Sequence, residues 1–350
     1  MVRYQQAMCC FRTIDKVFYF NMKLSRLGEF GLIEEIRRRA ATGRGVRIGI
    51  GDDCAWVDHL AGSSLITADL LIESIHFNLK WSSLDALGHK SLAVNLSDIA
   101  AMGGVPAYAI LSLGIPRKFD SKQIAEFYRG FNRLARRCGV ALIGGDTNFA
   151  KSLIVSVCLI GHPPARPVQR SGAKVGDDIY VTGTLGDAAL GLAHLRLRLT
   201  GAKSAASTQL LARHHRPTPR LTAGTLLARQ NLATAMIDVS DGLLQDLGHI
   251  CRASGIGAII WHERLPLSRA FLKLAGKVGR GLALNGGEDY ELLFCARPHQ
   301  RERIEKLSAP AKVQITRIGR CVTAAQGMTV LDGAGKAFSV QLKGHDHFKR

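Results

Sequence analysis

The chain of 350 residues is 47% hydrophobic and 21% charged, which is an ordinary globular composition, and its length fits two domains better than one. The formal net charge of +19 invites a nucleic-acid-binding interpretation, but the basic residues are spread along the chain and no aromatic residues alternate with them. General solubility in a basic proteome, or attraction of anionic small substrates, explains this charge at least as well.

The first predicted elements lead into an acidic turn. Residues 1–21 lack the positive start, apolar middle and cleavage site of a signal peptide, and Met22 opens an ordinary beginning. We therefore expect residues 1–21 to be a loose extension or a mis-called start. A helix is predicted over Ser25–Ala40. A short apolar strand after Arg47 then runs into GIGDD, residues 49–53, where glycines permit a close turn and two carboxylates follow.

Strands and helices alternate through the rest of the first half. The predicted elements are the strand Leu65–Ala68 that ends in Asp69, the helix Leu84–Met102, the strand Ala107–Ile115, a helix from the cap Ser121 to Gly139, the strand Val140–Ile143 and the strand Leu153–Gly161. Asn95 and Asp98 share one face of their helix. The strand Val140–Ile143 is expected to end in a Gly-Gly-Asp-Thr turn, residues 144–147.

Prolines 163, 164 and 167 mark the expected domain boundary, since proline continues neither regular element. We expect an N-terminal domain over residues 22–163 and a C-terminal α/β domain over residues 164–350. The predicted elements of the second half are the strand Asp178–Thr182, a Leu-rich helix after Gly186, a basic linker Arg213–Arg220, a further helix, the strand Ala235–Asp238, a helix capped by Ser240 and ended by Gly255, and the strand Leu292–Cys295.

Acidic residues gather beside glycines at the expected strand ends or on one helix face. Eleven of the 28 acids lie in such junctions: Asp52, Asp53, Asp69, Glu73, Asp98, Asp146, Asp238, Asp241, Glu288, Asp289 and Glu291. Loops at strand ends commonly carry binding groups, and carboxylates suit Mg²⁺ ions that also hold substrate phosphates. Asp and Gly also populate ordinary turns, but five separate occurrences favour a multi-metal cleft that handles phosphate.

Several familiar sites have no motif in this chain. There is no G-x-x-x-x-G-K-[ST] phosphate loop, no dinucleotide-type G-x-G-x-x-G and no G-x-S-x-G. The eight cysteines form no C-x-x-C pair, so a reduced, cytoplasmic compartment is the default expectation. The longest apolar run, residues 153–161, is too short to span a bilayer. His76 is isolated, and its spacing alone favours a buried structural role.

Ten motifs, in their order along the chain, closely resemble the thiamine-monophosphate kinase family. They are GEFGLIEEI, GIGDDCA, ITADLLIESIHF, KSLAVNLSDIAAMGG, LIGGDT, RSGAKVGDDIYVTGTLGDAALGL, RHHRPTPR, IDVSDGLLQDLGHI, NGGEDYELLF and KGHDHF. The resemblance implies an α/β (α+β) fold with the two-domain architecture of aminoimidazole ribonucleotide synthetase, whose superfamily includes selenophosphate synthetase and a hydrogenase-maturation protein. It also implies a homodimer formed through the sheet of the N-terminal domain, with ATP and several Mg²⁺ ions in a cleft.

The resemblance further implies roles for individual residues. The Mg²⁺ ligands would be Asp53, Thr67, Ala68, Asp69, Asp98, Asp146, Asp238 and Asp241. The nucleotide would contact Tyr128, Gly145, Asp146, Arg170 and Ser240. Thiamine phosphate would contact His76, Glu288 and His345, so the resemblance overrides the structural interpretation of His76. Two positions depart from the family pattern: Ala68 replaces a hydroxyl residue and leaves only its backbone, and His345 replaces an aromatic residue.

The implied reaction moves the γ-phosphoryl group of ATP onto thiamine monophosphate and forms thiamine diphosphate, the final step of its biosynthesis. Two polyanions must approach each other, and divalent ions screen both. No catalytic base or covalent residue is expected, because the acceptor phosphate is already ionised near neutral pH. One alternative is another ATP-dependent activating enzyme of the same fold, although Cys9–Cys10 lacks the glycine-rich setting of a selenophosphate-type enzyme. The other is a basic nucleic-acid-binding protein.

Overall fold

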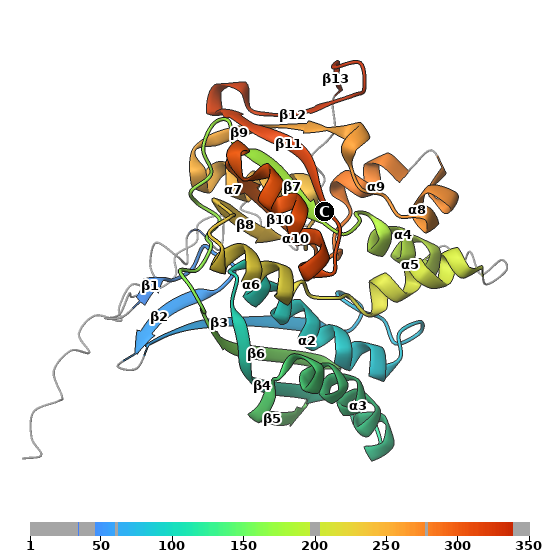
Figure 1. Ribbon diagram of the computed structural model, residues 1–350. Coiled ribbons are helices and arrows are strands. Elements are labelled where there is room, and N and C mark those ends of the chain that lie inside the picture. Colours follow the sequence, from blue (N-terminus) through green and yellow to red (C-terminus); the bar gives the residue numbers. More distant parts are fainter. Residues whose placement is uncertain (1–33, 35–45, 60–61, 197–203, 277–278, 339–350) are drawn as a thin grey trace, which may run out of the picture. The chain divides into compact units, whose positions relative to one another are not determined.

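The computed structural model describes Glu34 and residues 46–59, 62–196, 204–276 and 279–338, and all of these except Glu34 lie in one compact unit, Ala41–His345. They form two mixed sheets with helices packed on them (Figure 1). The first sheet has the strand order β1-β2-β3-β6-β4-β5, and the second has the order β13-β12-β9-β11-β7-β10-β8. The predicted α/β class is confirmed.

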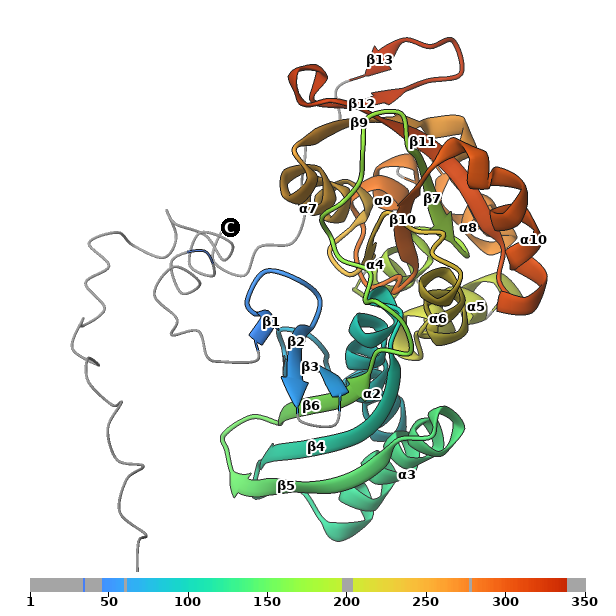
Figure 2. The same cartoon turned by 60° about the vertical axis from the view of Figure 1, so that its left-hand side comes forward.

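The first sheet packs against the helices α2 and α3 (Figure 2). Its elements, in chain order, are β1 (Val46–Ile48), β2 (Ala55–His59), β3 (Gly62–Ile72), α2 (Leu84–Ala101), β4 (Val105–Ile115), α3 (Ser121–Cys138), β5 (Ala141–Phe149) and β6 (Ile154–His162). Burial alternates along β6, as expected for a strand with one covered face. Val155, Val157 and Leu159 are buried in one core with Leu92 and Leu96 of α2.

Two glycines let α2 and α3 approach backbone to backbone. A Cβ atom at Gly88 would lie 2.0 Å from the carbonyl oxygen of Phe127, and a Cβ atom at Gly130 would lie 1.8 Å from that of Asp85. Neither position has room for a side chain, so glycine is required by the close approach. This crossing fixes the start of α2, where Asp85 and Lys90 lie, against α3.

The second sheet is built from the remaining elements. They are β7 (Asp178–Thr182), α4 (Asp187–Arg196), α5 (Ala205–His215), α6 (Leu221–Arg229), β8 (Ala235–Asp238), α7 (Leu243–Ser254), β9 (Ile256–Trp261), η1 (His262–Arg264), α8 (Arg269–Leu274), α9 (Gly279–Asn285), β10 (Leu292–Ala296), η3 (Pro298–Gln300), α10 (Arg301–Ala311), β11 (Ile315–Thr323), η4 (Ala324–Gln326), β12 (Met328–Leu331) and β13 (Ala337–Phe338). Every residue of β7, β8 and β10 is buried, which requires cover on both faces of the sheet.

Two cores cover this sheet, and α2 takes part in one of them. The larger core contains Leu247 of α7 and Phe271 of α8. The other core contains Phe294 of β10 together with Ala100 and Ala101 of α2. Helix α2 therefore packs against the first sheet and against the second half of the chain at once, which explains why 17 of its 18 residues are buried.

Several predicted elements are confirmed, and two strand ends are wrong. The strands Asp178–Thr182 and Ala235–Asp238 agree residue for residue with β7 and β8. Asp69 does not end its strand, because β3 continues to pair with β6 as far as Ile72. Residues 144–147 do not form a turn either, because β5 pairs with β4 through both glycines and on to Phe149.

Three helix boundaries also differ from the prediction. The cap of α3 is Asp120, whose carboxylate accepts the N–H of Gln123, while Ser121 is the first helical residue. Ser240 does not cap α7, whose N-cap is Gly242. Residues 213–215, predicted as linker, complete α5. In each case the helix begins or ends one or more residues away from the predicted position. Neighbouring side chains and tertiary contacts outweigh the local preference there.

Some predictions fall on residues that the structure does not describe. These are residues 1–21, His345 and all of the predicted helix Ser25–Ala40 except Glu34, which is helical. The domain limits 22–163 and 164–350 stay predictions. None of the helices in the described ranges combines the length and the apolar character that a bilayer crossing requires.

Candidate functional site

Three carboxylates meet between the first sheet and the second half of the chain. Asp53 follows β1, Asp98 lies near the end of α2, and Asp238 ends β8. Each offers one oxygen, and these oxygens all lie within 4.8 Å of one another. Asp53 and Asp238 are buried, and Asp98 is half-buried. Such a group of hard oxygen donors fits a divalent cation.

Hydrogen bonds orient each of these carboxylates. The hydroxyl of Thr67 donates to Asp98 over 2.6 Å, and the hydroxyl of Ser97 donates to Asp238 over 2.6 Å. Asp53 accepts two hydrogen bonds from the guanidinium of Arg170, at 3.1 and 2.9 Å. The predicted metal ligand Asp53 and the predicted nucleotide contact Arg170 are thus a bidentate ion pair in this structure.

The cluster is electrostatically unfavourable by itself. Burial, with the charge of Asp53, raises the pKa of Asp238 to about 8. Burial, with the charges of Asp69 and Asp238, raises the pKa of Asp98 well above its usual range. The pKa of Asp69 is raised to about 6 by burial. A bound cation would compensate this mutual repulsion, so the residues present fit the Mg²⁺ ions that the resemblance implies.

Asp146 is separated from this cluster by the sheet itself. Asp69 of β3 pairs with Val157 of β6, Val157 pairs with Leu111 of β4, and Leu111 pairs with Gly145 of β5. Asp146 is the next residue along β5, so its side chain points to the opposite face from that of Asp69. Three strand spacings amount to roughly 14 Å. Within one chain, Asp146 therefore does not join the cluster.

The other predicted metal and nucleotide positions lie in three places. Ala68 is exposed on β3, and Asp241 accepts a 2.9 Å hydrogen bond from Gln245 at the start of α7. Ser240 stands in the loop after β8, where its N–H donates to Asp246 over 3.1 Å. Tyr128 is half-buried on α3, with its ring edge-on to a neighbouring phenylalanine. The loop after β8 therefore brings Ser240 and Asp241 next to Asp238.

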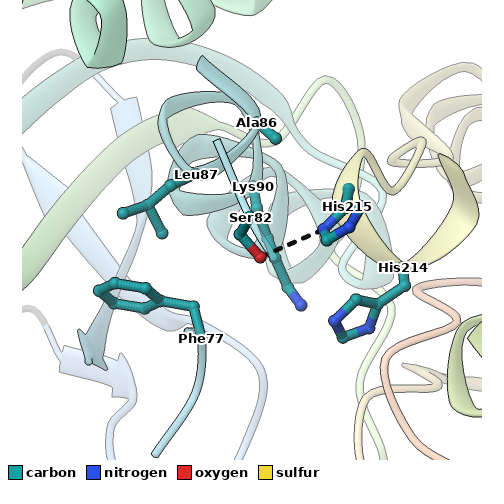
Figure 3. Close-up of a pocket in the computed structure, with 7 residues that line it drawn as sticks. All are labelled: Phe77, Ser82, Ala86, Leu87, Lys90, His214 and His215. Atoms are coloured by element: carbon teal, nitrogen blue, oxygen red, sulfur yellow. Dashed lines mark hydrogen bonds between the residues drawn. The ribbon is translucent and has the colours of Figure 1, made fainter. Parts of the chain in front are cut away.

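The two predicted thiamine phosphate contacts in the described part of the chain have different surroundings. Nδ1 of His76 accepts the backbone N–H of Ile72 over 3.0 Å. The carboxylate of Glu288 lies 2.5 Å from Nζ of Lys90 and 3.0 Å from Nδ1 of His214. Lys90 and His214 also line a small pocket with Phe77, Ser82, Ala86, Leu87 and His215 (Figure 3).

Several of the junction acids hold the fold together. Asp289 accepts the backbone N–H groups of Gly186 and Ala188 at the start of α4. Glu291 is fully buried and accepts hydrogen bonds from Arg213, Arg220 and Thr182. Asp246, which no sequence pattern singled out, accepts the N–H groups of three successive residues, 240–242. A carboxylate beside a glycine can thus serve the backbone as well as a metal.

No sequence pattern gave Lys90 or His214 a separate role. Both stand in quoted motifs, KSLAVNLSDIAAMGG and RHHRPTPR, so their motif membership was the only available signal. Their contacts with Glu288 join segments that lie far apart in the sequence. Only the fold brings such positions together.

Family models match most of the chain. Residues 51–162 match the N-terminal domain of AIR synthase related proteins, and residues 174–332 match the C-terminal domain of the same proteins. The first range contains Asp53 and Asp98, and the second contains Asp238 and Glu288. All three carboxylates of the cluster therefore lie inside matched regions.

Named relatives match over almost the whole chain. The thiamine-monophosphate kinase of Salmonella typhimurium is 41% identical over 327 residues, which cover 92% of this chain and 98% of the relative. That of Bacillus subtilis is 36% identical over 327 residues, covering 92% of this chain and 100% of the relative. The solved structure of AaThiL complexed with AMPPCP and TMP superimposes with a TM-score of 0.82 at 35% identity, covering 94% of this chain and 99% of that one.

Proposed function

Because the chain belongs to the thiamine-monophosphate kinase family of AIR synthase related proteins, we propose that it transfers the terminal phosphoryl group of ATP to thiamine monophosphate. The products are thiamine diphosphate and ADP. The main support for this proposal is the group of Asp53, Asp98 and Asp238, found in a chain whose relatives are named thiamine-monophosphate kinases. Phosphoryl transfer between two polyanions needs such a site.

Mg²⁺ ions would be held by Asp53, Asp98 and Asp238, with Asp69, Asp241, Thr67 and the backbone of Ala68 as further ligands. When bound, they supply charge neutralisation between the two phosphates. Arg170 and Ser240 would contact the nucleotide from the same cleft. The chain needs no catalytic base, because the second pKa of a phosphate monoester is about 6 and the acceptor is already ionised. Positioning and electrostatics then account for the acceleration.

His76 and Glu288 would contact thiamine phosphate on the acceptor side. The thiazolium ring of thiamine carries a positive charge, and the Glu288 carboxylate offers the opposite charge. Burial disfavours that carboxylate, but the charge of Lys90 and the contact with His214 outweigh burial and hold its pKa well below the usual range. Glu288 is therefore ionised throughout the physiological range and suits a cationic ligand.

A second copy of the chain would contribute residues to the nucleotide-binding part of the site. Strand β5 is an edge strand that is exposed along its whole length, with Ile143 56% and Phe149 61% exposed. Tyr108 of the neighbouring β4 is 49% exposed. An open edge beside apolar side chains favours pairing with another sheet. We place Gly145 and Asp146 of β5 at the partner's site in such a homodimer, because their own cluster lies three strands away. Tyr128 of α3 would contact the nucleotide bound there.

A reducing, cytoplasmic compartment fits this function. Six cysteines in the described ranges are free thiols, and the thiols of Cys295 and Cys321 lie 3.5 Å apart in the core without being joined. Unpaired buried thiols are typical of cytoplasmic proteins.

The test is an assay of the purified protein with ATP, Mg²⁺ and thiamine monophosphate. We expect thiamine diphosphate and ADP to appear in equal amounts, and neither to appear when Mg²⁺ is removed by a chelator. Thiamine in place of thiamine monophosphate is the acceptor control, and it should give no product. Absence of thiamine diphosphate across a range of Mg²⁺ concentrations would overturn the proposal.

A further inference from the structure

Three residues from distant parts of the chain form a clamp around one carboxylate. Lys90 comes from α2, His214 from α5, and Glu288 from the loop before β10. Nζ of Lys90 lies 2.5 Å from Oε1 of Glu288, and Nδ1 of His214 lies 3.0 Å from Oε2. Each carboxylate oxygen thus has its own partner. We call these three residues the Glu288 clamp.

We propose that Lys90 and His214 are positioning residues that hold the Glu288 carboxylate in place for the acceptor substrate. This inference rests on the proposed function, in which Glu288 contacts thiamine monophosphate. Neither residue has to touch the reacting phosphates. Both act through the orientation of Glu288.

The two residues that contact Glu288 are both buried. Lys90 is 4% exposed and His214 is 4% exposed, so both lie in a nearly dry environment. A buried ammonium group requires a charged partner, and Glu288 is the one to which Lys90 is paired. Burial, with the charge of Lys90, lowers the pKa of His214, so this imidazole is neutral near pH 7. Nδ1 of this ring lies 3.0 Å from Oε2 of Glu288 but has no hydrogen-bonded partner among the described residues, so His214 confines the carboxylate as a close polar neighbour.

The backbone at Glu288 is held as firmly as its side chain. Glu288 has φ +69° and Tyr290 has φ +51°, in the left-handed region that side chains rarely adopt. Their N–H groups donate to the carbonyl oxygens of Ser240 over 2.7 Å and of Val239 over 2.8 Å. Strained backbone of this kind persists where the surroundings enforce it, and it is common at functional sites. The loop is therefore tied to the segment that follows Asp238.

Helix α2 links the clamp to the carboxylate cluster. Lys90 and Asp98 are eight residues apart in this one helix, which corresponds to roughly 12 Å along its axis. The helix is buried on nearly all sides and cannot move one residue without the other. Lys90 therefore sets the place of Glu288 relative to the metal-binding end of the same helix, and so the distance between acceptor and donor sites.

A purely structural ion pair would give the same distances but different kinetics. If Lys90 and His214 only stabilised the fold, their replacement would lower the melting temperature and leave the Michaelis constants unchanged. If they position Glu288, their replacement raises KM for thiamine monophosphate and lowers kcat, but it leaves KM for ATP unchanged. The two roles can also be separated by combining each replacement with one at Glu288.

The experiment measures KM for thiamine monophosphate, KM for ATP, kcat and melting temperature for Lys90→Met, His214→Gln, Glu288→Gln and the double variants with Glu288→Gln. We expect Lys90→Met and His214→Gln each to reduce kcat/KM for thiamine monophosphate by roughly tenfold or more, as loss of an orienting contact does. In the Glu288→Gln background, neither replacement should reduce it further. Lys90→Arg, which keeps the charge, should recover part of the loss.

Lys306→Met is the matched control, because Lys306 and Glu302 form an ion pair at 2.6 Å with side chains 74% and 79% exposed. It should leave all four quantities unchanged. Wild-type kinetics in Lys90→Met or His214→Gln, or losses that multiply in the double variants, would overturn the clamp. If Lys90→Met does not fold, Lys90→Arg and His214→Gln decide the question alone. A wild-type protein that makes no thiamine diphosphate would instead overturn the proposed function.

Discussion

Ser97 donates a 2.6 Å hydrogen bond to Asp238, and this contact joins α2 to the end of β8 across 141 positions of the sequence. Ser97 is fully buried and Asp238 is 3% exposed. One carboxylate of the cluster is therefore oriented by a helix that packs on the other sheet. Anything that separates α2 from β8 would disturb the cluster, so the fold and the candidate metal site depend on the same contact.

The replacement Asp238→Asn tests whether repulsion between the clustered carboxylates destabilises the metal-free protein. Without metal and above pH 8, where the Asp238 carboxyl is ionised, we expect the variant to melt at or above the wild-type temperature, because a buried charge beside Asp53 is removed. With Mg²⁺ and ATP it should gain less stability than the wild type, because ligand stabilisation follows affinity. Differential scanning fluorimetry with and without both ligands measures this. An unchanged gain together with wild-type turnover would show that Asp238 is not a ligand.

The replacement Glu291→Gln should destabilise the protein by roughly 3 kcal/mol, because it removes the buried carboxylate that pairs with Arg213 and Arg220. Among the described residues, Arg213 keeps only Asp187 as an ion-pair partner, at 4.0 Å. Glu291 is fully buried, while the side chains of Arg213 and Arg220 are 18% and 16% exposed. Urea unfolding measures the change in free energy. Glu302→Gln, at the exposed pair with Lys306, is the control and should cost less than about 1 kcal/mol. Equal losses in the two variants would contradict this assignment.

Asp85 should make the stability of the protein depend on acid pH. Hydrogen bonds from Arg133, with those from Arg216 and Arg129, hold the pKa of its carboxyl well below the usual range. A carboxyl whose pKa is lowered by folding contributes stability above its unfolded value, roughly 3.9, and loses that contribution as pH falls toward the folded value. In Asp85→Asn the contribution is absent at every pH.

We therefore expect Asp85→Asn to lower the free energy of unfolding by about 1–2 kcal/mol at pH 7 and to approach the wild type near pH 2, since the partly exposed arginines weaken the pairing. Urea unfolding at several pH values between 7 and 2 tests the difference. A variant that is equally destabilised across this range would show that Asp85 acts by packing instead of by charge.

The sequence predicted elements best where the ends are marked locally. Strands β7 and β8 agree with their predicted limits because turn residues bound them, and α3 ends at Gly139, which has φ +70°. The local pattern predicts strand ends at Asp69 and at the Gly144–Gly145 pair, because glycine and aspartate usually mark turns. Their strands continue because long partner strands, β6 and β4, supply hydrogen bonds that override the local preference.

The sequence predicts which residue types form the site, but it does not predict which of the acidic residues come together. The repeated acidic junctions identified Asp53, Asp98 and Asp238, which the fold brings together. The same pattern also contained Asp289 and Glu291, which bind backbone N–H groups and arginines instead. Local sequence does not distinguish a ligand from such a structural carboxylate, because the difference lies in what distant segments place beside it.

The edge strand β5 should mediate self-association. Replacing Ile143, which is 56% exposed, with lysine puts a charge into the proposed contact and should convert a dimer into a monomer. Light scattering coupled to size exclusion measures the mass. The matched control is Leu272→Lys, since Leu272 is 65% exposed on α8 in the other half of the chain. A wild-type protein that is monomeric at micromolar concentration would contradict the proposal.

Asp146 should act in the site of the partner chain, because its own cluster lies across three strands and on the opposite face of the sheet. Asp146→Asn and Asp238→Asn should each be inactive alone. When the two variants are co-expressed, mixed dimers contain one site with both aspartates intact, so about a quarter of wild-type activity should return. Co-expression of Asp98→Asn with Asp238→Asn is the control, because both residues belong to one chain's cluster and no intact site can form. Recovery in the control, or none with Asp146→Asn, would show that Asp146 does not complete the partner's site.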